Sequence, residues 1–133
     1  MVERIESKGF DEFEGIVKAV EITDNDLQQD AEGKALKQYK VTIATEASST
    51  GFMYEWINIS SKATEIAVPE GSNLDKFLIE LEMVHKEVKS IEKIYEALAV
   101  MIGKKYLFKK KRLGKSYDGK EAKEFWIPVS VIE

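Results

Sequence analysis

Aromatic and basic side chains gather in two short stretches of this chain, and their types suggest one kind of chemistry. The first stretch is GFMYEWINIS, residues 51–60, where Phe52, Tyr54 and Trp56 recur at every second position. The second is KKYLFKKKRLGK, residues 104–115, which holds seven Lys or Arg and no acid. Aromatic faces stack on nucleobases at about 1 to 3 kcal/mol per base, and cations track phosphates. The two stretches together favour a surface that meets single-stranded nucleic acid.

The orientation of residues 51–60 decides whether the aromatic side chains can act in this way. An extended chain places the three aromatic residues on one face and Met53, Ile57 and Ile59 on the other. The isoleucines favour burial of their own face, which would expose the aromatic residues. Glu55 lies on that same isoleucine face and opposes its burial. The sequence leaves the choice between the two faces open.

A neighbouring stretch adds polar candidates to the predicted surface. Residues 36–45, LKQYKVTIAT, alternate between an apolar side, where Tyr39 is predicted to join the core, and a polar side. Trp126 is expected to fill one end of the domain. The predicted nucleic-acid contacts are Gln38, Lys40, Phe52, Tyr54, Trp56, Lys109, Lys110, Lys111, Arg112 and Lys115.

Length, composition and charge set the class of protein. The 133 residues, 44% apolar and without cysteine, predict one domain over residues 13–133 behind a weakly defined arm at residues 1–12. No run of 18 apolar residues and no secretory signal is evident, so we expect a cytoplasmic protein with no membrane contact. The net charge of −4 conceals a separation, because ten acids and only three bases occupy the first 32 residues. The basic run therefore says more about binding than the net charge does.

Hydrophobic periodicity gives the order of the elements. Strands are predicted at 13–22, 36–45, 51–60 and 106–112, with a last strand from residue 123, and a long solvated loop at 23–35. Ser72 is a candidate N-cap for a helix whose apolar stripe runs to Leu81. A second stripe through Ile91, Ile94, Tyr95, Leu98 and Ile102 gives either a second helix or one bent helix that ends at Gly103. Pro128 predicts an edge or a bulge in the last strand, because it has no N–H to donate.

This order predicts a mostly β fold, a five-stranded Greek-key OB-fold barrel with one or two helices between strands 3 and 4. Gly15 supports the barrel, since a long first strand that serves both halves must bend. An open α+β sheet covered by the helical segment is the alternative with the same elements.

The chain also resembles a known family, the small OB-fold single-stranded DNA-binding or replication-protein-A-like proteins of phages, plasmids and archaea. The resemblance covers about residues 13 to 132 and rests on FEGIVKAVEI, GKALKQYKVTI, YEWINIS, GSNLDKFLIELE and MIGKKYLFKKKRLGKSYDGKEAKEFWIPVSVI. It implies DNA binding across the second and third strands and the neighbouring loops. The acidic N-terminus and the long helical region depart from that pattern.

The residues give no support for catalysis, and we expect neither an enzyme nor a cofactor. His85, the single histidine, lies in a charged segment and is expected to be solvated. The acids of residues 24–32 lack the spacing of a calcium loop, and no transition-metal motif occurs. Two hypotheses follow: a protein that binds single-stranded DNA, with RNA as an open alternative, and an interaction module that docks a protein partner in a phage or replication assembly.

Overall fold

The computed structural model describes residues 11–29, 32–112 and 124–133, apart from the side chains of residues 26–28. The fold is mostly β: a five-stranded antiparallel sheet in the order β3-β2-β1-β4-β5, with two helices between β3 and β4. The elements in chain order are β1 (Glu12–Gln29), β2 (Ala35–Ala44), β3 (Phe52–Asn58), α1 (Asn73–Val84), the 3₁₀ helix η1 (Lys86–Ser90), α2 (Ile94–Ala99), β4 (Lys105–Arg112) and β5 (Glu124–Val131).

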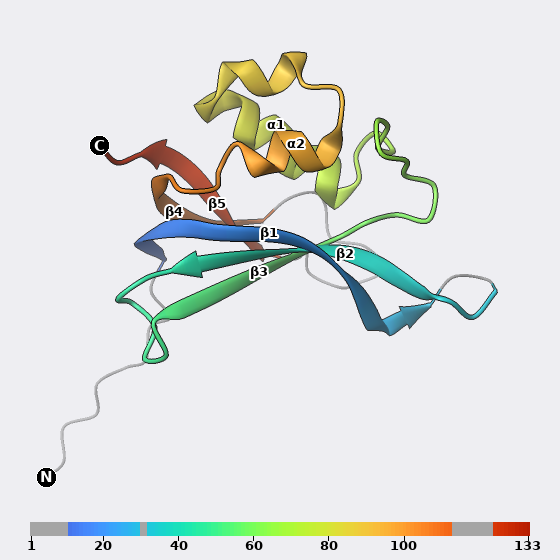
Figure 1. Ribbon diagram of the computed structural model, residues 1–133, viewed down its shortest axis with the longest axis horizontal. Coiled ribbons are helices and arrows are strands. Elements are labelled where there is room, and N and C mark those ends of the chain that lie inside the picture. Colours follow the sequence, from blue (N-terminus) through green and yellow to red (C-terminus); the bar gives the residue numbers. More distant parts are fainter. Residues whose placement is uncertain (1–10, 30–31, 113–123) are drawn as a thin grey trace, which may run out of the picture.

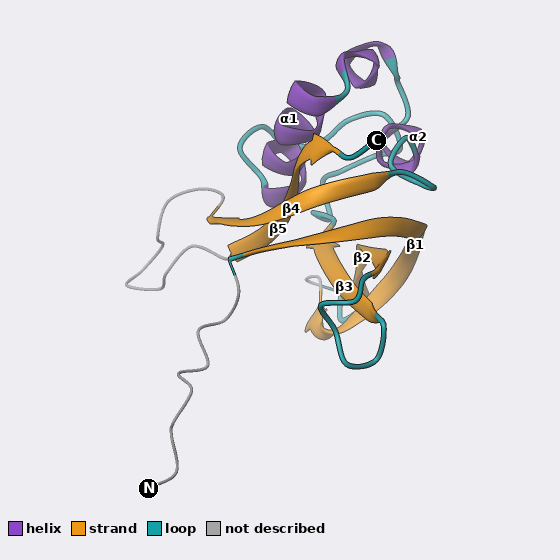
Figure 2. Cartoon of the chain, turned by 90° about the vertical axis from the view of Figure 1, so that its left-hand side faces the viewer, coloured by secondary structure: helices purple, strands orange, loops and turns teal. Residues whose placement is uncertain are grey.

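The layers are visible in Figures 1 and 2. The helical segment lies on one side of the strands, next to β4 and β5, and β2 and β3 lie on the side away from the helices. Within the described part of the chain, the outermost strands β3 and β5 share no backbone ladder. None of the helices described is long and apolar enough to cross a lipid bilayer.

β1 is the strand that joins the two halves of the sheet. Its first residues, Glu12 to Ile16, pair with β4, and the part from Ile16 to Gln29 pairs with β2. A register shift between Val17 and Ala19 marks the change from one half to the other. A Cβ on Gly15 would lie 2.5 Å from Ile43 Cγ2, so this position admits no side chain. The bend predicted at Gly15 therefore coincides with a close approach of β1 to β2.

β1 continues through much of the segment predicted as a solvated loop, so that prediction is wrong for residues 23–29. Thr23, Asp24 and Asn25 pair in register with residues 36–38 of β2. Cross-strand side-chain contacts compensate for the low apolar content: Gln38 Nε2 donates to Thr23 Oγ1 at 3.3 Å, and Lys37 forms an ion pair with Asp24. Strand pairing overrides local turn chemistry here.

The helical segment forms two α-helices joined by a 3₁₀ turn, which decides between the two predicted alternatives. Ser72 caps α1 as predicted, and its hydroxyl accepts a hydrogen bond from the Asp75 backbone N–H at 3.3 Å. The second predicted apolar stripe is only partly correct, because its members Tyr95 and Ile102 are exposed. The buried face of this region is formed by Ile94, Ala97, Leu98 and Met101.

β5 lies at the edge of the sheet, and its pairing is irregular near Pro128. Leu107 pairs with Ser130 but Phe108 pairs with Pro128, so the register shifts by one residue at Val129. Both the edge and the bulge predicted for Pro128 are present. Pro128 at this bulge is buried, although simple alternation places it opposite the core.

His85 is buried, at 8% exposure, and the prediction of a solvated histidine is wrong. It ends α1, and its Nε2 lies 2.6 Å from the hydroxyl of Tyr106 on β4, which is fully buried. Burial, and next the charge of Lys104, lower the pKa of His85, against an opposing effect of Glu87. Burial also raises the pKa of Tyr106. The neutral pair fastens the helical segment to the sheet.

Candidate nucleic-acid interface

The alternation of β3 exposes the aromatic residues and buries the opposite side. Phe52, Tyr54 and Trp56 are 43%, 40% and 41% exposed, whereas Ile57 is fully buried and Glu55 is 7% exposed. The question that the sequence left open is thereby answered, since the side with the isoleucine and the glutamate faces inward. Tyr39 of β2 lies in the core, as predicted.

β2 and β3 pair so that the predicted polar and aromatic candidates share one face. Gln38 is opposite Asn58, Lys40 opposite Trp56, Thr42 opposite Tyr54 and Ala44 opposite Phe52. Cross-strand neighbours in an antiparallel pair project to the same side. We call this set, Gln38, Lys40, Thr42, Phe52, Tyr54 and Trp56, the aromatic face.

The aromatic face has close contacts along its centre. The rings of Tyr54 and Trp56 have centroids 5.8 Å apart at an interplanar angle of 35°. The Lys40 ammonium lies 4.6 Å from the Tyr54 centroid, within the range of a cation–π contact. With 5.8 Å between their centres, the two rings are already in contact, so a base would stack on top of them rather than between them.

The basic candidates of β4 are exposed, but each lies beside an acid from another element. We call Lys109, Lys110, Lys111 and Arg112 the basic strand. The nitrogen–oxygen distances are 3.8 Å from Lys109 to Glu12, 3.3 Å from Lys110 to Glu124, 3.4 Å from Lys111 to Glu80 and 3.1 Å from Arg112 to Glu124. Hydrogen bonds from Arg112 and Lys110 lower the pKa of Glu124, which keeps this carboxylate charged. Residues 104–115 contain no acid in the sequence, but in the folded protein acidic side chains from other elements lie beside the basic strand.

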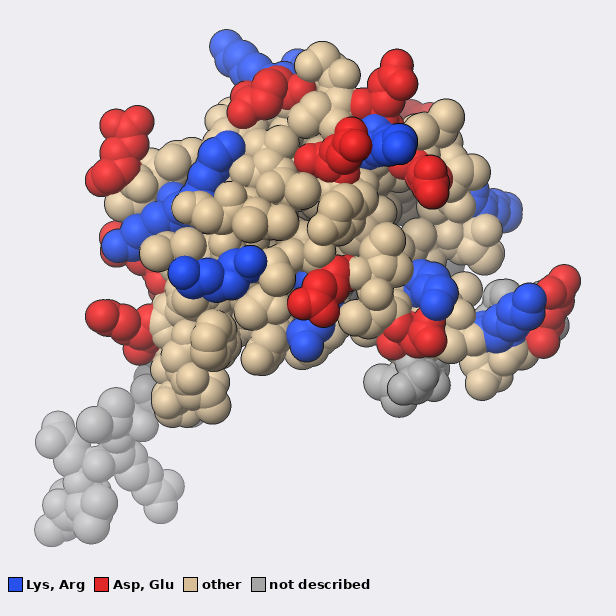
Figure 3. Space-filling model, viewed as in Figure 1, with Lys and Arg blue, Asp and Glu red and all other residues tan. Residues whose placement is uncertain are grey.

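Charged side chains of both signs are also mixed on one whole face of the molecule (Figure 3). On the face drawn in Figure 3, Lys and Arg side chains lie among Asp and Glu side chains around a broad uncharged area. Exposed pairs of this kind contribute at most about 1 kcal/mol each, so a competing anion can separate them. Each carboxylate nevertheless weakens the attraction of its cation for a phosphate.

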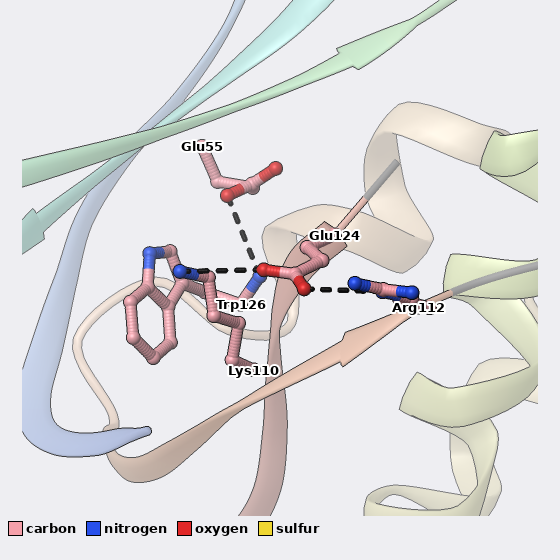
Figure 4. A network of polar contacts seen from close by, with 5 residues as sticks. All are labelled: Glu55, Lys110, Arg112, Glu124 and Trp126. Atoms are coloured by element: carbon pink, nitrogen blue, oxygen red, sulfur yellow. Dashed lines mark hydrogen bonds and ion pairs between the residues drawn. The ribbon is translucent and has the colours of Figure 1, made fainter. Parts of the chain in front are cut away.

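A network of polar contacts links β3 to the basic strand, as Figure 4 shows. Glu55 accepts a hydrogen bond from the backbone N–H of Trp126 on β5, at 3.4 Å. The Trp126 ring packs against the buried Phe13 with centroids 4.8 Å apart, in agreement with a filling role. The Lys110 ammonium lies 5.6 Å from the centroid of that ring. Glu55, on the inward side of β3, therefore contacts β5, and β5 in turn carries the Trp126 ring and the Glu124 carboxylate beside Lys110 of the basic strand.

Sequence reasoning missed several residues of this region. The sequence pattern marks Glu55 as an obstacle to burial, although it supplies the β3–β5 contact. The acids that oppose the basic strand, Glu12, Glu80 and Glu124, come from β1, α1 and β5, and no local pattern signals such contacts. Thr42 belongs to the aromatic face by simple alternation and could have been included. Lys115 and the loop of the last hairpin lie outside the described residues.

A shallow hollow opens at the other end of β2, away from the Gln38–Asn58 pair. It is lined by the start of β1, the β2–β3 turn and Lys105, and its charged residues include Glu12, Glu14 and Glu46. Glu12 and Glu14 already face Lys109 and Lys105, at 3.8 and 3.7 Å. In the portion of the chain that the structure describes, no cluster of three or more metal-ligating side chains occurs.

Comparison of the chain with protein-family models, with curated proteins and with solved structures found no match. The resemblance to OB-fold single-stranded DNA-binding proteins therefore stays a prediction.

Proposed function

We propose that this protein binds single-stranded DNA, with little sequence preference and without catalysis or a cofactor, in replication or recombination. Bases stack on Phe52, Tyr54 and Trp56, while Gln38 and Lys40 contact the strand beside them. The basic strand supplies contacts to the phosphates, and Lys115, outside the described residues, is a further phosphate contact predicted from the sequence. The observation that carries the proposal is the exposure of the three aromatic side chains on one face of β3, in register with Lys40.

An OB-fold barrel is the architecture that we propose for this chain. The long β1 pairs with both β2 and β4, which is the connectivity that such a barrel requires. The close approach of β1 to β2 at Gly15 and the hydrogen bond from the Trp126 N–H of β5 to Glu55 of β3 support this proposal. The strands 2 and 3 of OB folds carry their ligands, which agrees with the position of the aromatic face.

Stacking is the interaction best supported by the side chains present. Each aromatic residue offers a sequence-tolerant surface, because every base has a flat face. Three exposed aromatic side chains along β3 lower the solubility of the protein, and stacked bases would cover them. This is the reason to prefer a base-stacking ligand over a purely ionic one.

Fluorescence anisotropy of labelled oligo-deoxythymidine tests the proposal at low salt. We expect Trp56→Ala to weaken binding about 5- to 150-fold, the equivalent of about 1 to 3 kcal/mol for one stacked base. Ile79→Ala is the control, because Ile79 is also exposed, at 51%, but lies on α1. Lack of binding by the unaltered protein, or equal binding by Trp56→Ala, would contradict the proposal. Competition with oligouridine separates DNA from RNA.

The second candidate is an OB-fold interaction module that docks a protein partner and binds no nucleic acid. The ion pairs of the basic strand favour it, because they leave little uncompensated positive charge for phosphates. A protein that co-purifies with this chain, together with no oligonucleotide binding, would support this candidate over the first.

A further inference from the structure

The aromatic face and the β1 residues beside it carry little net charge. The register continues from β3 through β2 to β1, so Trp56, Lys40 and Glu21 form one row across three strands. The next rows are Tyr54, Thr42 and Ala19 on one side, and Asn58, Gln38 and Thr23 on the other. Within these rows Lys40 and Glu21 are the charged residues, and their formal charges cancel.

Lys40 is itself already engaged on this face. Its ammonium lies 4.6 Å from the centroid of the Tyr54 ring, and Glu21 is its cross-strand neighbour. Held in this way, it can meet one phosphate of a strand whose bases lie over Tyr54 and Trp56. The rows therefore hold two aromatic surfaces, Tyr54 and Trp56, Phe52 adds a third further along β3, and Lys40 gives about one phosphate contact.

The basic strand adds less positive charge than its composition suggests. Three carboxylates, those of Glu12, Glu80 and Glu124, lie within 3.1 to 3.8 Å of its four cations. A phosphate that binds there must displace a carboxylate, so the gain is the difference between two similar ionic contacts. The basic strand therefore releases few counterions from DNA, and this release adds little to the affinity.

We infer that the ligand is recognised by its unpaired bases, and that the described residues contribute about one phosphate contact to affinity. This inference rests on the proposed function and specifies the ligand: a strand with accessible base faces, whether or not its backbone is charged. A protein that depended on phosphates would require a charged backbone. An uncharged thymine peptide nucleic acid is the probe that separates the two cases.

The salt dependence has a definite expected size. For each phosphate contact, the binding constant for a single strand falls with about the 0.7th power of the salt concentration. One contact therefore gives about a 3-fold loss of affinity between about 50 and 200 mM salt. Full engagement of Lys40 and the four cations of the basic strand would give about a 100-fold loss over the same range. These two values are far enough apart for one titration to distinguish them.

The experiment compares oligo-deoxythymidine with the peptide nucleic acid of equal length, using the full chain. We expect both to bind with affinities within about 5-fold at about 200 mM salt, and a shallow slope for DNA. Steep salt dependence with no binding of the uncharged probe overturns the inference while leaving the proposed function in place. No binding of either probe overturns both.

Two variants sharpen the comparison. Lys40→Ala should weaken DNA binding about 3-fold at about 50 mM salt and flatten the slope, with no effect on the uncharged probe. Trp56→Ala should weaken both probes equally, by about 5- to 150-fold, with the slope unchanged. Circular dichroism and urea unfolding confirm that each variant is folded. Loss of DNA binding alone in Trp56→Ala would contradict base recognition.

Discussion

The Glu55 carboxylate of β3 accepts a hydrogen bond from the backbone N–H of Trp126 on β5, at 3.4 Å. It does so between two strands that, in the described parts of the chain, share no ladder. Glu55 is 7% exposed and points inward, whereas its chain neighbours Tyr54 and Trp56 are exposed on the opposite side of β3. Glu55 thus lies on the inward side of β3, beside the fully buried Ile57, and contacts β5 from there.

Removal of this acceptor should destabilise the protein. Glu55→Ala leaves the Trp126 N–H without its carboxylate, and we expect a loss of about 1 to 3 kcal/mol in the free energy of unfolding. Glu55→Gln keeps an acceptor oxygen at the same place and should lose less than about half of that amount. Urea unfolding measures both. Equal stability of Glu55→Ala and the unaltered protein would show that the contact does not hold β5.

Gly15 is expected to tolerate no side chain. In Gly15→Ala the new Cβ would meet Ile43 Cγ2 at 2.5 Å and the Ala44 carbonyl oxygen at 3.0 Å. Separation of β1 from β2 should cost about 1 to 3 kcal/mol, by analogy with overpacked cores. Glu14→Ala, at the exposed neighbouring position, should stay within about 0.5 kcal/mol. An unchanged unfolding midpoint for Gly15→Ala would contradict the close approach of the two strands.

The buried His85–Tyr106 pair predicts a dependence of stability on pH. The pKa of His85 is lowered in the folded state, so the unfolded chain takes up a proton first as the pH falls below about 6.5. The stability contributed by neutral His85 is complete above about pH 6.5 and is lost below it. Unfolding titrations between about pH 7.5 and 5.5 should show this loss.

His85→Gln is the variant that isolates this effect. The glutamine side chain can accept a hydrogen bond from the Tyr106 hydroxyl but does not titrate, so the stability of this variant should change less over the same pH range. Identical pH profiles for His85→Gln and the unaltered protein would exclude His85 as the source.

Neutralising the acids beside the basic strand should convert it into a phosphate site. In the triple variant Glu12→Gln, Glu80→Gln, Glu124→Gln, the four cations lose their carboxylate neighbours. DNA affinity at low salt should rise, and the loss between about 50 and 200 mM salt should grow from about 3-fold towards about 100-fold. The exposed residues Glu70, Glu92 and Glu96, changed to Gln together, give a control of equal net charge. Equal slopes for the two triple variants would contradict the screening role of the acids.

Periodicity predicted the elements of this fold well where one face of an element is buried. The β2 alternation, the Ser72 cap of α1 and the edge position of Pro128 all follow from local rules and are confirmed. Residues 23–29 could not be predicted as strand, because their pairing with β2 rests on polar cross-strand contacts such as Gln38 to Thr23. Local turn residues conceal such pairing.

The candidate site was predictable only in part, for a related reason. The sequence predicts the aromatic residues, but Glu55 is buried on the opposite side of β3, and its contact lies 71 positions away at Trp126. The acids beside the basic strand also come from other elements, as Glu80 of α1 does, 31 positions from Lys111. His85 was misjudged because its partner Tyr106 lies on another element. Long-range polar contacts leave no periodic signal.

Tryptophan fluorescence during titration with oligo-deoxythymidine tests the central claim most directly. The variant Trp126→Phe retains Trp56 as the single tryptophan, and Trp56→Phe retains Trp126. Stacking on the aromatic face predicts strong quenching in Trp126→Phe and little change in Trp56→Phe, although both variants bind. Quenching confined to Trp56→Phe, or no binding in either variant, would contradict the claim that β3 carries the nucleic acid.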